Sequence, residues 1–131
     1  MKKILFVFLM LLCSVSYAEW EDVGKTDSYA NFVDRSTIRT KGNFVEMWIL
    51  QNFFDEQVST DRKKWKSTTA LTRFDCKDET LATVFFINYA KENGKGDAVF
   101  SYLYKTNEIR DLPIAPGTTS ELLWQIACGR E

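Results

Sequence analysis

The sequence predicts an α+β fold, in which an antiparallel β-sheet of about five to six strands carries one C-terminal helix packed on it. Runs rich in β-branched and aromatic residues alternate with short polar turns through most of the chain, which is typical of strands. Pro113 and Pro116 mark the end of this pattern, because proline has no amide donor for strand pairing. After Gly117 the apolar residues follow a helical spacing instead.

Six segments are predicted to be strands, and they are residues 29–33, 37–40, 44–50, 63–74, 81–87 and 98–104. Lys41-Gly42-Asn43 and Asn93-Gly94-Lys95-Gly96 are predicted turns, since glycine adopts positive φ without a steric cost. The polar stretch from Asp55 to Asp61 is predicted to be a loop. The segment 81–87 is the most β-prone of the six and should lie centrally in the sheet.

A single helix is predicted from Thr119 to Cys128. Thr118 and Glu121 match a capping box, in which each side chain binds a backbone amide of the other residue. The apolar stripe that would face the sheet consists of Leu122, Leu123, Ile126 and Ala127.

Residues 1–18 have the three parts of a secretory signal peptide: a basic start, an apolar run and small residues before the expected cut. The apolar run, residues 4–12, is shorter than the roughly 20 residues that a membrane-spanning helix needs. We therefore expect cleavage after Ala18, leaving one domain over residues 19–131 with no transmembrane segment. Lipid attachment at Cys13 is disfavoured, because Leu12 stands where a lipoprotein has a small residue. The product should be periplasmic, or lie at the surface or outside of a bacterial cell.

Composition excludes several classes of function. Without Lys2 and Lys3 the chain keeps 15 basic and 18 acidic residues, and this net charge of about −3 argues against a nucleic-acid partner. The chain has no histidine, which excludes Ser-His-Asp and Cys-His catalysis and imidazole zinc sites. We expect no metal site and no cofactor.

Two cysteines, Cys76 and Cys128, remain after signal cleavage. In an oxidising compartment they are predicted to form a disulfide that ties the helix to the sheet. The alternative is a reactive thiol, but a redox pair is normally close in sequence and a nucleophile needs a base that this chain lacks.

The order of these features resembles the surface-adhesin protein E family of small exported bacterial proteins. The matching positions are Trp20, Tyr29, Val33, Asp34, Ile38, Gly42, Trp48, Ser67, Phe74-Asp75-Cys76, Tyr89 and the Pro-Gly-led helix that ends at Cys128. The resemblance implies an antiparallel sheet with a C-terminal helix held by one disulfide. It also implies adhesion, because the best-known member is an outer-surface adhesin that binds extracellular-matrix and serum proteins.

A basic strip is the first candidate binding site. If the predicted strand begins as early as Arg62, then Arg62, Lys64 and Lys66 fall on one of its faces, with Trp65 between them. They would suit sulfated glycans or an acidic protein patch. Lysines also guard edge strands against aggregation, and the acidic residues nearby favour that second interpretation.

Aromatic residues supply two further candidates. Phe53 and Phe54 precede a polar loop, and adjacent strand residues cannot both point inward, so one should be available for contact. Phe100, Tyr102 and Tyr104 share one face of their strand, and alternating aromatics of this kind are predicted to lie in the core.

Carboxylate chemistry is the enzymatic route that needs no histidine. Glu46, within an apolar strand, is its best candidate, against the alternative of an outward-facing glutamate. The sequence thus predicts a non-catalytic exported module that binds a protein, envelope or extracellular-matrix component. A small periplasmic carboxylate enzyme is the alternative, and an inhibitor or accessory subunit of an envelope complex is a third possibility.

Overall fold

The structure is a computed structural model that describes residues 18–131. The predicted signal peptide, up to Tyr17, and Cys13 lie outside the described residues, so cleavage after Ala18 stays a prediction. The elements are β1 (Glu21–Lys25), β2 (Tyr29–Lys41), β3 (Phe44–Val58), β4 (Lys64–Asp75), β5 (Thr80–Tyr89), η1 (Glu92–Gly94), β6 (Ala98–Leu103), η2 (Thr106–Glu108), β7 (Leu112–Pro113) and α1 (Thr119–Cys128).

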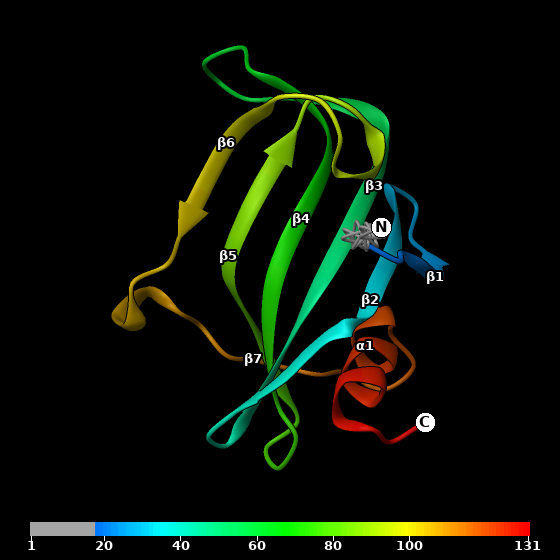
Figure 1. Ribbon diagram of the computed structural model, residues 1–131, viewed down its shortest axis with the longest axis vertical. Coiled ribbons are helices and arrows are strands. Elements are labelled where there is room, and N and C mark those ends of the chain that lie inside the picture. The colour runs from blue at the N-terminus through cyan, green and yellow to red at the C-terminus, as the bar shows by residue number, and fades with distance from the viewer. Residues whose placement is uncertain (1–17) are drawn as a thin grey trace, which may run out of the picture.

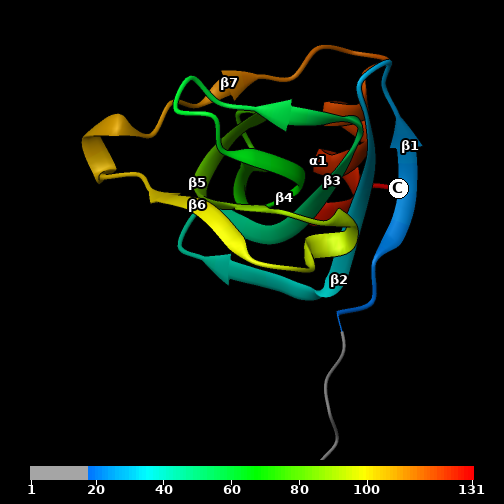
Figure 2. The same ribbon diagram turned by 90° about the horizontal axis from the view of Figure 1, so that it is seen from above.

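One antiparallel sheet forms the body of the protein, with strand order β1-β2-β3-β4-β5-β6 and the short β7 paired with β5. The sheet curls strongly, and α1 lies on its concave side toward one end (Figure 1). Seen from above, the strands wrap around the helix (Figure 2). This confirms the predicted α+β fold with a C-terminal helix on an antiparallel sheet.

The core lies where α1 meets the concave face. Its buried residues come from β2, β3, β4 and the helix, and they are Val33, Met47, Ile49, Phe74, Leu123, Trp124, Ile126 and Ala127. The indole Nε1–H of Trp124 donates to the backbone oxygen of Asp75 at 2.9 Å, which orients the helix on the end of β4. Three of the four residues of the predicted helix stripe are buried, whereas Leu122 is exposed.

The helix begins and ends as predicted. The Thr118 hydroxyl accepts a hydrogen bond from the backbone N–H of Glu121 at 3.3 Å, which is one half of the predicted capping box. Within residues 18–131 the Glu121 side chain does not supply the other half, because the Thr118 backbone N–H receives no bond from it. Gly129 closes the helix in the left-handed conformation that favours glycine.

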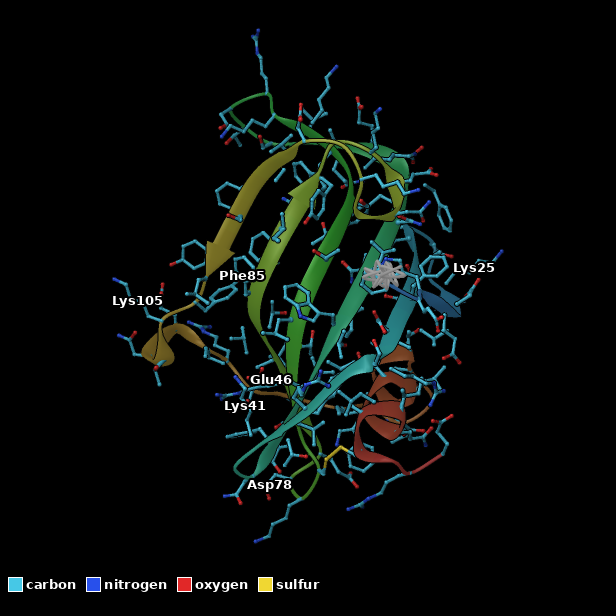
Figure 3. All side chains as sticks on the ribbon, in the orientation of Figure 1. Lys25, Lys41, Glu46, Asp78, Phe85 and Lys105 are labelled. Carbon is cyan, nitrogen blue, oxygen red and sulfur yellow. A yellow bond between two sulfur atoms is a disulfide. The ribbon has the colours of Figure 1, made fainter. Side chains whose placement is uncertain are left out.

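The disulfide between Cys76 and Cys128 is present, with its Cα atoms 5.7 Å apart. It joins the turn after β4 to the last residue of α1 and is the yellow bond in Figure 3. Arg35 adds a second tie at this end, because it forms ion pairs with Glu21 on β1 and with Glu131 after the helix.

Four strand assignments differ from the sequence prediction. Two predicted strands are one, β2, interrupted by a register shift between Asp34 and Arg39. The predicted loop 55–61 was wrong in its first half, since β3 runs to Val58. Pro113 was expected to stop strand pairing, yet it sits opposite Thr80 in a two-residue edge strand, where a missing amide can face away from the partner.

The fourth difference is β1, which has no apolar alternation and was not predicted. It pairs with β2 across a register shift between Asp22 and Gly24, and the Asp22 carboxylate accepts the Gly24 amide at 2.9 Å. β1 is therefore a strand because it pairs with β2, and not because its own sequence alternates between apolar and polar residues.

The turn η1 covers part of the opposite, convex face. Asn52 and Asn93 exchange two hydrogen bonds of 2.8 Å, and the Ser67 hydroxyl donates to the Lys91 oxygen at 2.6 Å. Gly94 has a φ of +67°, and a Cβ there would lie 3.2 Å from the Thr69 side chain. Glycine is needed at this position because the turn packs closely on β4.

Candidate functional site

Beyond the N-terminal end of α1 the helix no longer covers the concave face, and a cavity of about 280 Å³ lies there. Strands β2 to β5, Tyr104 and the start of α1 line it. The lining residues are Tyr29, Asn31, Ile49, Gln51, Thr68, Ala70, Thr72, Leu81, Thr83, Phe86, Tyr104, Thr119, Ser120 and Leu123. We call this space the inner cavity.

The floor of the inner cavity is polar but uncharged. Asparagine, glutamine and threonine side chains project from four neighbouring strands, and they are Asn31, Gln51, Thr68, Thr72 and Thr83. Among the described residues that line the cavity, none is an aspartate, glutamate, lysine or arginine. Threonine suits this position, because its β-branched side chain favours strands and its hydroxyl both donates and accepts hydrogen bonds.

Two of these polar groups are almost completely buried. Asn31 is 2% exposed and Thr72 is 4% exposed, and among residues 18–131 no side-chain polar atom that is sealed from solvent lacks a partner, so their polar atoms remain accessible from the inner cavity. A buried polar group left without a partner costs roughly 1–3 kcal/mol, so such groups are normally satisfied by water or by a ligand. Both residues face the inner cavity, which makes it the natural source of their partners.

A second cavity of about 400 Å³, the outer cavity, continues toward the loop between β3 and β4. Its lining combines three aromatic rings and a valine with five polar or charged residues, and consists of Ser59, Thr60, Asp61, Lys63, Trp65, Phe86, Asn88, Val99 and Phe100. Phe86 lines both cavities. The Thr68 hydroxyl of the inner cavity donates to the Asn88 amide oxygen of the outer one at 2.8 Å, so the two cavities are neighbours, and we call them together the groove.

Aromatic rings of β5 and β6 form the wall of this groove. Phe86 packs against Phe100 and Tyr104 with ring centroids 5.8 and 6.1 Å apart, and Tyr102 meets Tyr104 edge-on at 4.9 Å. Phe100 and Tyr102 are exposed, so the prediction that they belong to the core was wrong. An exposed strand and a core strand can have the same alternation of aromatic residues. Within residues 18–131 no second layer covers the sheet at β6, and the sequence pattern alone does not indicate this.

Glu108 fixes the strand end that carries Tyr102. The Tyr102 hydroxyl donates to one carboxylate oxygen at 2.6 Å, and the Lys105 backbone N–H donates to the other at 2.9 Å. These bonds favour the ionised carboxylate, chiefly the one from Tyr102, so the pKa of Glu108 lies below its usual range. The same bond raises the pKa of Tyr102.

A depressed carboxylate pKa stabilises the folded state above the pKa of the unfolded chain, and this is lost as the pH falls through the folded value. We expect an NMR titration to place the pKa of Glu108 below that of an unperturbed glutamate. Tyr102→Phe should return it toward that value, because the largest cause of the shift is removed. An unchanged pKa in Tyr102→Phe would contradict this assignment.

The predicted basic strip lies at the loop between β3 and β4 and at the start of β4. Lys64 pairs with Glu56 at 3.8 Å, while the Lys66 amine donates to the Phe54 oxygen at 2.6 Å and lies 4.0 Å from Glu92. Arg62 lies in the turn, with a φ of +65°. Acidic neighbours thus offset the charge of the two lysines. Binding by Arg62, Lys64 and Lys66 stays a prediction.

The two adjacent phenylalanines have different surroundings. Phe53 packs edge-on against Tyr29 with ring centroids 5.5 Å apart, which places it beside the inner cavity. Phe54 is largely exposed, while its backbone N–H donates to the Ser28 oxygen at 3.0 Å and its backbone oxygen accepts from the Lys66 amine. A binding role for either ring also stays a prediction.

Glu46 forms an ion pair with one cation. Its carboxylate is 3.7 Å from the Lys41 amine, and both residues are labelled in Figure 3. In the sheet Glu46 sits opposite Arg39 on β2 and Arg73 on β4. These neighbours fit the alternative of a glutamate held in an ion pair on the sheet.

A family model, Surface-adhesin protein E, matches residues 20–129. The chain belongs to this family. Two solved structures of Haemophilus influenzae protein E share the fold of this family member. One has a TM-score of 0.63 at 19% identity, covering 87% of this chain and 86% of the other. The second, from a non-typeable strain, has a TM-score of 0.61 at 19% identity, covering 88% and 79%. No curated protein sequence matches the chain.

Residues 18–131 of this family member contain no cluster of three or more cysteine, aspartate or glutamate residues that could hold a metal ion. Over the same residues, no helix has the length and apolar character needed to cross a membrane.

Proposed function

We propose that this surface-adhesin protein E family member is an exported, non-catalytic binding module that holds a protein partner at the open edge of β6. Membership of the family supports binding as the function. The single observation that supports this surface is the composition of β6, AVFSYL, which has neither charge nor proline and pairs on one side only, with β5. The partner would be a host-matrix or envelope protein with an extended segment.

The two edges of the sheet differ in a way that favours β6. Natural edge strands are protected from unwanted pairing by charges, prolines, bulges or short length. β1 has such protection, since three of the residues in EDVGK are charged and its register shifts at Gly24. β6 has exposed apolar side chains, among them Phe100, Tyr102 and Leu103. An extended peptide can add to such an edge through main-chain hydrogen bonds, with side chains giving specificity.

Charge placed on the edge of β6 should weaken binding. Leu103→Lys is expected to weaken binding to immobilised extracellular-matrix proteins at least about tenfold, because an edge lysine opposes strand addition. Surface plasmon resonance with the mature protein measures this. Leu112→Lys is the matched control: Leu103 and Leu112 are 66% and 57% exposed, each on a short edge strand, but Leu112 lies on β7.

Equal losses in Leu103→Lys and Leu112→Lys would contradict binding at β6. Location is tested separately, by adding protease to intact cells. Digestion of the mature protein is expected if it acts as a surface adhesin, whereas protection would place it in the periplasm and leave an envelope component as the partner.

A further inference from the structure

We propose that the groove on the concave face, made of the inner and outer cavities, binds a short neutral oligosaccharide of about two to three sugar rings. This site goes beyond protein binding at β6 and uses a different face of the sheet. Four features of the groove carry the proposal: the polar side chains on its floor, the lack of charge in the inner cavity, its aromatic wall, and a floor whose backbone groups are already paired within the sheet.

The polar floor matches the hydrogen-bonding character of a sugar. The side chains of Asn31, Gln51 and Thr72 each offer both donors and acceptors, as does every sugar hydroxyl. Thr68 donates to the Asn88 oxygen, which leaves the Asn88 amide protons to donate into the outer cavity. Asn31 and Thr72 are largely buried residues that line the inner cavity, so a ligand there can take the place of the water that meets their polar atoms.

The absence of charge in the inner cavity selects a neutral ligand. Moving a sulfate, phosphate or carboxylate into a site without a counter-charge is costly, because the lost hydration is not replaced. None of the residues that line the inner cavity is cationic or anionic. Asp61 and Lys63 lie at the far end of the outer cavity, where they form an ion pair with each other at 3.7 Å.

The aromatic wall suits the apolar faces of sugar rings. Phe86 stands at the junction of the two cavities, with Trp65 and Phe100 beyond it. A large flat aromatic ring can cover the C–H face of a sugar ring. The hydroxyl groups at the edge of the sugar ring then remain free to reach polar partners. A sugar has both kinds of surface, and the groove presents a polar floor beside an aromatic wall.

An extended peptide fits this groove less well. The floor is formed by β2, β3, β4 and β5, each of which is paired with a strand on both sides. Their backbone groups are therefore engaged in the sheet, and strand addition requires an open edge. Only side chains remain to bind a ligand here, and these are neutral, short and spread over four strands.

The experiment uses the mature protein with triacetylchitotriose and maltotriose as neutral probes, 3′-sialyllactose as a charged probe and a blocked, uncharged hexapeptide. Calorimetry should show saturable binding of at least one neutral trisaccharide, at least about tenfold tighter than sialyllactose. NMR should show shifts of the Asn31 and Asn88 side-chain amides on titration. Failure of both neutral sugars to bind, or preferential binding of sialyllactose or the hexapeptide in the groove, would overturn the proposal.

Two matched substitutions on β4 localise the site. Thr72→Val removes a hydroxyl that faces the inner cavity and should weaken sugar binding about five- to tenfold. Thr69→Val makes the same change at a buried residue that contacts Gly94 on the convex face, and should leave binding unchanged. Equal effects of the two would overturn the proposal. Leu103→Lys should also leave sugar binding intact, so that failure at the groove and failure at β6 are told apart.

Discussion

Replacing both Cys76 and Cys128 with serine is expected to lower the free energy of unfolding by about 4 kcal/mol. The bond joins residues that are 52 apart in sequence, and without it the unfolded chain regains the conformational freedom of that loop. The bond also holds α1 against the sheet, and α1 supplies half of the buried core residues. Urea unfolding of the oxidised protein and of the double variant measures the difference.

Reduction of the native protein by dithiothreitol serves as a control, since it removes the same bond without changing a side chain. Both treatments should lower the free energy of unfolding by a similar amount. A decrease of less than about 1 kcal/mol would show that the packing of α1 holds the helix without the disulfide.

Phe74→Ala is expected to destabilise the protein by about 3–5 kcal/mol, because it removes a large side chain from a packed core and leaves a cavity. Phe74 is completely buried, on β4 between Val45 and Leu81. Phe54→Ala is the matched control, since Phe54 is 49% exposed and should cost less than about 0.5 kcal/mol. Thermal or urea unfolding distinguishes the two.

If both phenylalanine variants lost the same stability, the core would not lie where α1 meets the sheet. Phe54→Ala has a second use, because Phe54 is among the predicted contact residues. A loss of matrix binding with unchanged stability would support that prediction.

Much of the fold could be predicted because local patterns and tertiary packing agree. The helix from Thr119 to Cys128 has the predicted bounds, since its cap and its apolar stripe both come from adjacent residues. The central strands follow from alternation and turn residues. β1 and the end of β3 could not be predicted, because their pairing is imposed by neighbouring strands and not by their own composition.

The groove could not be predicted for a different reason. Thr68, Thr72 and Asn31 are ordinary strand residues in the sequence, and they become a site only when curling brings four strands around the end of a short helix. Phe100 and Tyr102 show the same limit, since their exposure depends on where the second layer stops. One signal was present but uninformative by itself: polar residues on the inward face of apolar strands.

The difference between the two sheet edges also limits how the molecule can assemble. Head-to-tail pairing of β6 with β1 of another copy would leave new ends open and grow into a filament. The charges and the register shift at β1 oppose that step. The proposed binding at β6 is therefore compatible with a species that does not polymerise through β1.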